Sequence, residues 1–135
     1  MRAFLPLVAA VLWAWPAHAQ SPACPLSVPI NQTSSTILVA GISGQRIAVC
    51  SLVLVNAIAQ NVSLVEGTAA ACGTNTVGLI GGATASLALP TTGILALPSP
   101  VPIFRTSVSG DSLCLLQSGA SNVSGFLTYS LQLAP

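Results

Sequence analysis

Residues 125–133 read GFLTYSLQL, and apolar and polar side chains alternate along them. In an extended chain, the apolar side chains of Leu127, Tyr129, Leu131 and Leu133 fall on one face, and the intervening polar side chains fall on the other. This period of two predicts a β-strand with one buried face.

Residues 46–55, RIAVCSLVLV, are apolar on both faces of an extended chain. A continuous apolar run is also compatible with a buried helix. The β-branched residues in the run, and the flanking Gly41, Gly44 and Asn56, favour a strand. We therefore predict a central strand here, buried on both faces.

The rest of the chain contains short β-prone runs separated by turn residues. This pattern is typical of a β-sandwich or barrel. Prolines recur through residues 90–102, and their missing N–H groups favour a loop or an edge strand there. We predict an all-β fold, an antiparallel, jelly-roll-like β-sandwich of about eight short strands. Besides the two strands above, the expected strands are 26–30, 35–40, 61–66, 85–89, 101–107 and 112–117.

The first residues have the three parts of an export signal. Arg2 supplies a positive charge, residues 3–15 are apolar, and Ala17 and Ala19 provide small side chains before Gln20. The apolar run is shorter than the roughly 20 residues that span a bilayer. We predict a signal peptide at residues 1–19, cleaved after Ala19. The mature chain, residues 20–135, would then be a single domain without a membrane span.

Charge is scarce. Residues 20–135 contain Arg46 and Arg105 against Glu66 and Asp111, so their formal net charge is 2 − 2 = 0. Only 4% of the whole chain is charged, against about 25% in an average domain, while 53% is hydrophobic, which excludes a disordered chain. A neutral surface favours self-association. We therefore expect a homo-oligomer.

The composition also excludes most catalytic chemistry. After residue 19 there is no His and no Lys, so neither a Ser-His-Asp triad nor a Schiff base can form. Glu66 and Asp111 are the only carboxylate side chains, and both adjoin glycines where turns are expected. We predict turn or salt-bridge roles for them and no enzyme activity. Two arginines without net positive charge do not favour a nucleic-acid partner.

The cysteines are Cys24, Cys50, Cys72 and Cys114. An even number in an exported chain predicts two disulfides, and the sequence leaves three pairings open. Four buried free thiols are the alternative. Because the chain has no C-x-x-C motif and no His after residue 19, we expect neither a metal site nor a cofactor.

A sugar-binding site would need an aromatic side chain on which a ring can stack, and residues 20–135 offer Phe104, Phe126 and Tyr129. Tyr129 belongs to the apolar face of residues 125–133 and is expected in the core. Phe104 follows the proline-rich stretch and is the candidate ligand contact.

Several segments resemble a diffuse group of small all-β proteins that includes phage virion-associated proteins and secreted bacterial relatives. The resemblance implies a sandwich, possible trimers, a structural or surface role, and no catalytic residue. The chain differs from the group at residues 98–102, which are proline-rich where the others are usually glycine-rich. The predicted signal peptide favours the exported bacterial branch. The segments are IAVCS (47–51), LVEGT (64–68), CGT (72–74), LIGG (79–82), SGDSLC (109–114) and VSGFLTY (123–129).

Together, these patterns predict an exported, non-enzymatic structural or assembly module at the cell surface or in the periplasm. Its partners would be copies of itself or other surface proteins. The alternative is a binding module for a glycan or another neutral ligand.

Overall fold

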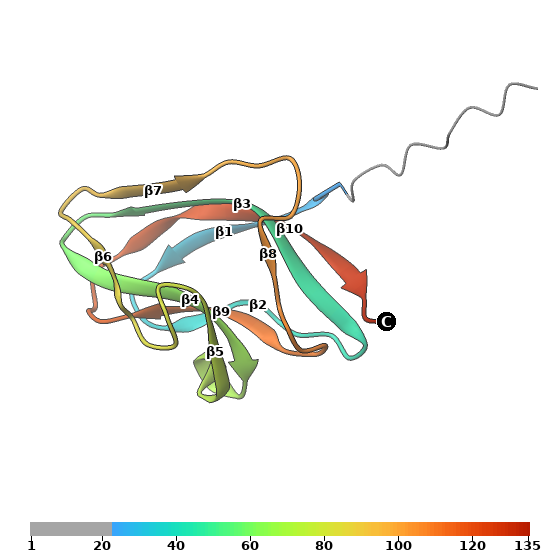
Figure 1. Ribbon diagram of the computed structural model, residues 1–135. Helices are drawn as coiled ribbons and strands as arrows, with labels where there is room; N and C mark the ends of the chain where they lie inside the picture. Colours follow the sequence, from blue (N-terminus) through green and yellow to red (C-terminus); the bar gives the residue numbers. More distant parts are fainter. Residues whose placement is uncertain (1–22) are drawn as a thin grey trace, which may run out of the picture.

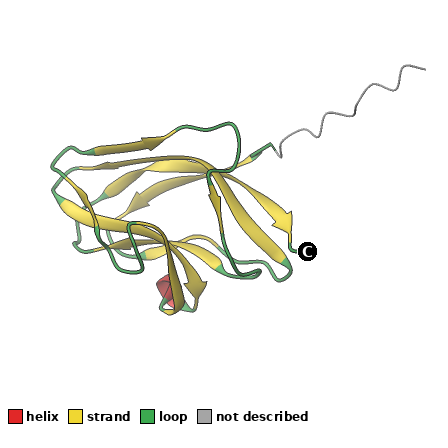
Figure 2. Ribbon diagram, viewed as in Figure 1, coloured by secondary structure: helices red, strands yellow, loops and turns green. Residues whose placement is uncertain are grey.

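The computed structural model describes residues 23–135, so the predicted signal peptide at residues 1–19 lies outside the described part. The described chain forms two antiparallel five-stranded sheets that face each other (Figures 1 and 2). The strands are β1 (Leu26–Gln32), β2 (Thr36–Val39), β3 (Gln45–Asn56), β4 (Gln60–Thr68), β5 (Thr74–Ile80), β6 (Leu87–Leu89), β7 (Ile94–Leu97), β8 (Phe104–Arg105), β9 (Ser112–Gln117) and β10 (Val123–Leu133). A short 3-10 helix, η1 (Ala70–Cys72), lies between β4 and β5.

Sheet A has the strand order β1-β10-β3-β7, and β8 also pairs with β3. Sheet B has the order β2-β9-β4-β5, and β6 also pairs with β4. The chain changes sheets several times, and one of these connections runs from β8 in sheet A to β9 in sheet B at one end of the sandwich (Figure 1). The predicted all-β sandwich is confirmed.

The long strands β3 and β10 form where the sequence predicts strands, and they pair at the centre of sheet A. The expected burial of β3 on both faces is wrong, because Val53 and Val55 on its outer face are only partly buried. Leu52 lies opposite Leu127, and both side chains are completely buried. The pairing shifts register between Thr128 and Tyr129, so Cys50 is an extra residue in β3. The helix interpretation of residues 46–55 is therefore wrong.

The core lies between the sheets and receives alternate side chains from both of them. Partly buried residues, including Phe104, Tyr129 and Leu131, pack against it. Its buried members are Ile30, Leu38, Val39, Ile47, Val49, Leu52, Leu54, Val62, Leu64, Leu89, Leu113, Leu115, Val123 and Leu127.

Ten strands form where the sequence predicts about eight. The two additional strands are β5 and β7, and both lie at sheet edges. β7 occupies the interval between Pro90 and Pro98, where no residue lacks an N–H group. The predicted strand 101–107 is reduced to β8, Phe104–Arg105.

Both predicted disulfides form, and they settle the pairing that the sequence left open. Cys24–Cys50 joins the segment before β1 to β3 in sheet A, and Cys72–Cys114 joins η1 to β9 in sheet B. No cysteine among the described residues is free. The two bonds indicate an oxidising compartment. Residues 23–135 contain no helix with the length and hydropathy of a membrane span.

Candidate functional site

A pair of acidic residues lies in the interior, at the end of the sandwich where the loop between β8 and β9 crosses from sheet A to sheet B. In β4, Val62 and Leu64 enter the core, and alternation places Glu66 on the same side. Asp111 directly precedes β9. Glu66 is 0% exposed and Asp111 is 6% exposed.

Ser107 holds the Glu66 carboxylate. Its backbone N–H donates a hydrogen bond to Oε2 of Glu66 at 2.5 Å, and its hydroxyl donates to Oε1. Hydrogen bonds to a charged acceptor are stronger than those between neutral groups. Glu66 thus ties β4 of sheet B to the loop that leaves β8 of sheet A.

The rest of this crossing loop, residues 106–111, is bound to the start of β3. The N–H of Thr106 donates to the carbonyl of Ile47 at 2.9 Å, and the N–H of Ile47 donates to the Thr106 hydroxyl at 3.1 Å. The N–H of Gly110 donates to the carbonyl of Gln45 at 2.9 Å. The loop that ends in Asp111 is therefore fastened to both sheets.

The surroundings of Asp111 disfavour the charged form of its carboxyl. Burial, reinforced by the negative charge of Glu66, raises the pKa of the Asp111 carboxyl. The hydrogen bonds of Glu66 come from Ser107 and not from an arginine. Glu66 also lies within a strand, where the sequence predicts a turn next to Gly67; this expectation is wrong because Gly67 continues β4 and pairs with Ser112 of β9.

The arginines lie on the outer face of sheet A. Arg46 precedes Ile47, which enters the core, so alternation directs Arg46 outward. Arg105 follows Phe104, which packs on the core, and is exposed. The expected ion pairs between these arginines and Glu66 are therefore not formed, and the Nε atom of Arg46 has no hydrogen-bond partner in the described part of the chain.

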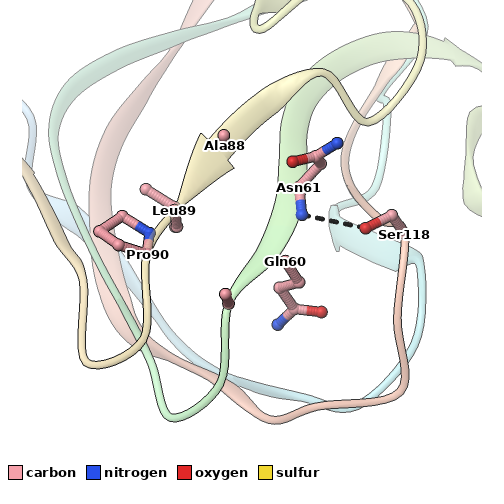
Figure 3. A pocket seen from close by; sticks show the side chains of 7 residues that line it. Gln60, Asn61, Ala88, Leu89, Pro90 and Ser118 are labelled. Carbon is pink, nitrogen blue, oxygen red and sulfur yellow. Dashed lines mark hydrogen bonds between the residues drawn. The ribbon is translucent and has the colours of Figure 1, made fainter.

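A second feature is a shallow pocket of about 460 Å³ beside the start of β4. Figure 3 shows Asn61 at its rim, where the backbone N–H of Asn61 donates to the Ser118 hydroxyl at 2.9 Å. Gln60 points away from them and donates through Nε2 to the carbonyl of Ser121 at 3.1 Å. The pocket carries no charged group. Its lining consists of Ala59, Gln60, Asn61, Ala88, Leu89, Pro90 and Ser118.

A third feature is an apolar area on the outer face of sheet A. Phe126 of β10 lies between Pro29 of β1 and Val53 of β3, and Val53 in turn lies opposite Ala96 of β7. This row faces outward because the neighbouring row, which contains Leu52 and Leu127, enters the core. Val55 and Ile94 pair with each other and extend it. We call these six residues the apolar face: Pro29, Val53, Val55, Ile94, Ala96 and Phe126.

The aromatic residues differ in exposure from what the sequence predicts. Phe104, the candidate ligand contact, packs its ring against the core from β8, and Tyr129 also packs there, as expected. Phe126 is the exposed aromatic, with 45% of its surface accessible. A ligand contact at Phe104 stays a prediction, but its packing does not favour it.

Ser107 and the apolar face are the features that sequence reasoning missed. The pairing of β1, β10, β3 and β7 creates the apolar face, and no segment shows it alone. The described residues contain no cluster of three or more potential metal ligands. Comparisons of the chain with protein-family profiles, with curated protein sequences and with solved structures found no match.

Proposed function

We propose that the chain is an exported, non-enzymatic structural or assembly module that associates with copies of itself through the apolar face of sheet A. The observation that carries this proposal is the exposure of large apolar side chains on the outer surface of one sheet. Ile94 is 68% exposed and Phe126 is 45% exposed. Burying such side chains contributes roughly 25 cal/mol per Å² of apolar area.

The distribution of charge supports a second copy as the partner. Glu66 and Asp111 are interior, while Arg46 pairs with Gln132 and Arg105 pairs with Ala48, toward the other end of β3 from the apolar face. The apolar face thus has no charge with which a charged partner could pair. A second apolar face matches it in polarity, and a two-fold axis brings the same surface of each copy together.

The burial of the acids supports a role without catalysis. A glycosidase needs two carboxyl groups that reach a substrate from solvent. Glu66, at 0% exposure, is instead bonded to Ser107. These hydrogen bonds hold the crossing loop in place, which is a structural role.

The intact mass of the exported protein, measured with and without reductant and after size exclusion, tests the proposal. We expect a chain that begins at Gln20, gains four hydrogens on reduction, and elutes as an oligomer. A monomer that retains residues 1–19 and stays inside the cell would contradict it.

A binding module for a glycan or another neutral ligand is the second candidate. The pocket favours it, because polar Gln60, Asn61 and Ser118 adjoin apolar Leu89 and Pro90 without any charge. The pocket has no aromatic side chain for stacking a sugar ring, so we rank this function second. Binding on a glycan array that is lost in Asn61→Ala would support it. An array without signal would oppose it.

A further inference from the structure

The interior position of both acids leaves their negative charges without a cation beside them. Glu66 faces the core side of β4, and Asp111 lies at the inner end of the crossing loop, 6% exposed. Both arginines are directed to the outer face of sheet A. Two carboxylates that share a buried site repel each other, and the uptake of one proton removes that repulsion.

We propose that Glu66 and Asp111 form a pH-sensitive pair that makes the folded domain more stable at mildly acidic pH than at neutral pH. The pair takes up one proton as the pH falls. The two carboxyls then no longer repel each other where the crossing loop is held. The inference concerns the single folded chain and does not depend on self-association.

The two carboxyls differ in their hydrogen bonds. Glu66 accepts two hydrogen bonds from Ser107. No hydrogen bond to the Asp111 side chain occurs among the described residues, and burial disfavours its charge. Asp111 is therefore the carboxyl that binds the proton.

The direction of the pH dependence follows from this assignment. A carboxyl whose pKa is higher in the folded than in the unfolded protein binds protons more tightly when folded. Stability therefore falls as the pH rises through the folded-state pKa of Asp111. The stability that Asp111 contributes is greatest below the pKa of Asp111 in the unfolded protein.

The other charged and titratable groups lie elsewhere. On β3 and β8, Arg46 and Arg105 are directed outward, and on β10, Tyr129 packs against the core from sheet A. The four cysteines are in disulfides. At the end of the described residues, Pro135 is exposed, and the N–H of Ala134 before it donates to the carbonyl of Gly44. The loop itself, residues 106–111, contributes only Asp111. The negative charge that acts on Asp111 is that of Glu66.

Denaturant unfolding of the disulfide-bonded protein across about pH 4.5 to pH 7.5 tests the proposal. We expect the unfolding midpoint of the wild type to increase on acidification. The Asp111→Asn variant carries a neutral side chain of the same shape, so we expect a midpoint above that of the wild type at neutral pH and little change with pH. A wild-type midpoint that is flat or falls on acidification would overturn the proposal, as would an unchanged pH dependence in Asp111→Asn.

Two further measurements on the wild type keep the test decisive if Asp111→Asn does not fold. Carboxyl ¹³C chemical shifts report the protonation of each acid directly. We expect the Asp111 signal to titrate above the range of an exposed aspartate. Hydrogen exchange of the amides in residues 106–111 should slow on acidification by more than the intrinsic exchange rate does. Titration of Asp111 in the ordinary range, with unchanged loop protection, would overturn the proposal.

Discussion

The Glu66 carboxylate accepts hydrogen bonds from both the backbone N–H and the hydroxyl of Ser107, and so joins the two sheets across the crossing loop. Glu66 lies in β4 of sheet B, and Ser107 follows β8 of sheet A. This contact connects the loop to sheet B, in addition to the hydrogen bonds that bind the loop to β3. It suggests a specific substitution.

We expect Ser107→Ala to lower the free energy of unfolding by about 1.5–3 kcal/mol, because it removes one hydrogen bond to a buried charge. The backbone N–H of residue 107 keeps its own bond to Glu66. Ser109→Ala is the matched control, since Ser109 is exposed like Ser107 and lies in the same loop, but its side chain makes no hydrogen bond among the described residues. Equal stability of the two variants in denaturant unfolding would show that the hydroxyl contributes nothing.

The two disulfides should differ in their accessibility to reductant. Cys72 and Cys114 are both 0% exposed, whereas Cys24 is only partly buried. We expect a mild thiol to reduce Cys24–Cys50 first, and differential alkylation followed by mass spectrometry will identify the reduced pair. Simultaneous reduction of both bonds, or earlier reduction of Cys72–Cys114, would contradict this order.

Leu52 and Leu127 lie opposite each other in β3 and β10 and are both buried in the core. Because both are 0% exposed, we expect Leu127→Ala to cost about 2–5 kcal/mol through lost burial and a cavity. Leu133, in the same strand, is 83% exposed, so Leu133→Ala should change stability by less than about 0.5 kcal/mol. The comparison requires only the two unfolding curves. A similar loss in both variants would mean that β10 does not face the core as described.

Gly125 is required by its backbone conformation and by its surroundings. Its φ is +146°, and an added Cβ would collide with the carbonyl oxygen of Val53. Gly44 also has a positive φ, of +76°, but an added Cβ meets nothing within 4 Å. We expect Gly44→Ala to cost about 1–2 kcal/mol of unfolding free energy, and Gly125→Ala to cost about 1–3 kcal/mol more because of the collision. Thermal unfolding of both variants measures the difference.

The strands that a short sequence pattern specifies were predicted well. The alternation in residues 125–133 and the apolar run in residues 46–55 correspond to β10 and β3, because each segment is long and its own residues favour a strand. Burial was predicted less well, since Leu133 is 83% exposed. β5 and β7 were missed because edge strands need little burial, and the prolines around β7 obscured it. Gly67 indicated a turn, yet it continues β4, since a glycine is compatible with both.

The site was less predictable than the fold. Ser107 is one serine among many, and only the crossing of the chain between the sheets brings it to Glu66. Likewise, Phe126 and Ile94 belong to different strands that meet on one surface only after β10, β3 and β7 pair. Scarce charge led us to expect self-association, which stays a prediction, and it did not indicate which face would be involved.

Light scattering after size exclusion tests the central claim most directly when it is applied to wild type, Ile94→Lys and Ile58→Lys. Ile94 lies on the apolar face, whereas Ile58, 61% exposed, lies between β3 and β4 and off that face. Burying an unpaired lysine at an interface costs about 3–5 kcal/mol, which weakens association by more than about a hundredfold. We predict that the wild type and Ile58→Lys are oligomers and that Ile94→Lys is a folded monomer. A monomeric wild type, or an Ile94→Lys oligomer as stable as the wild type, would contradict the account.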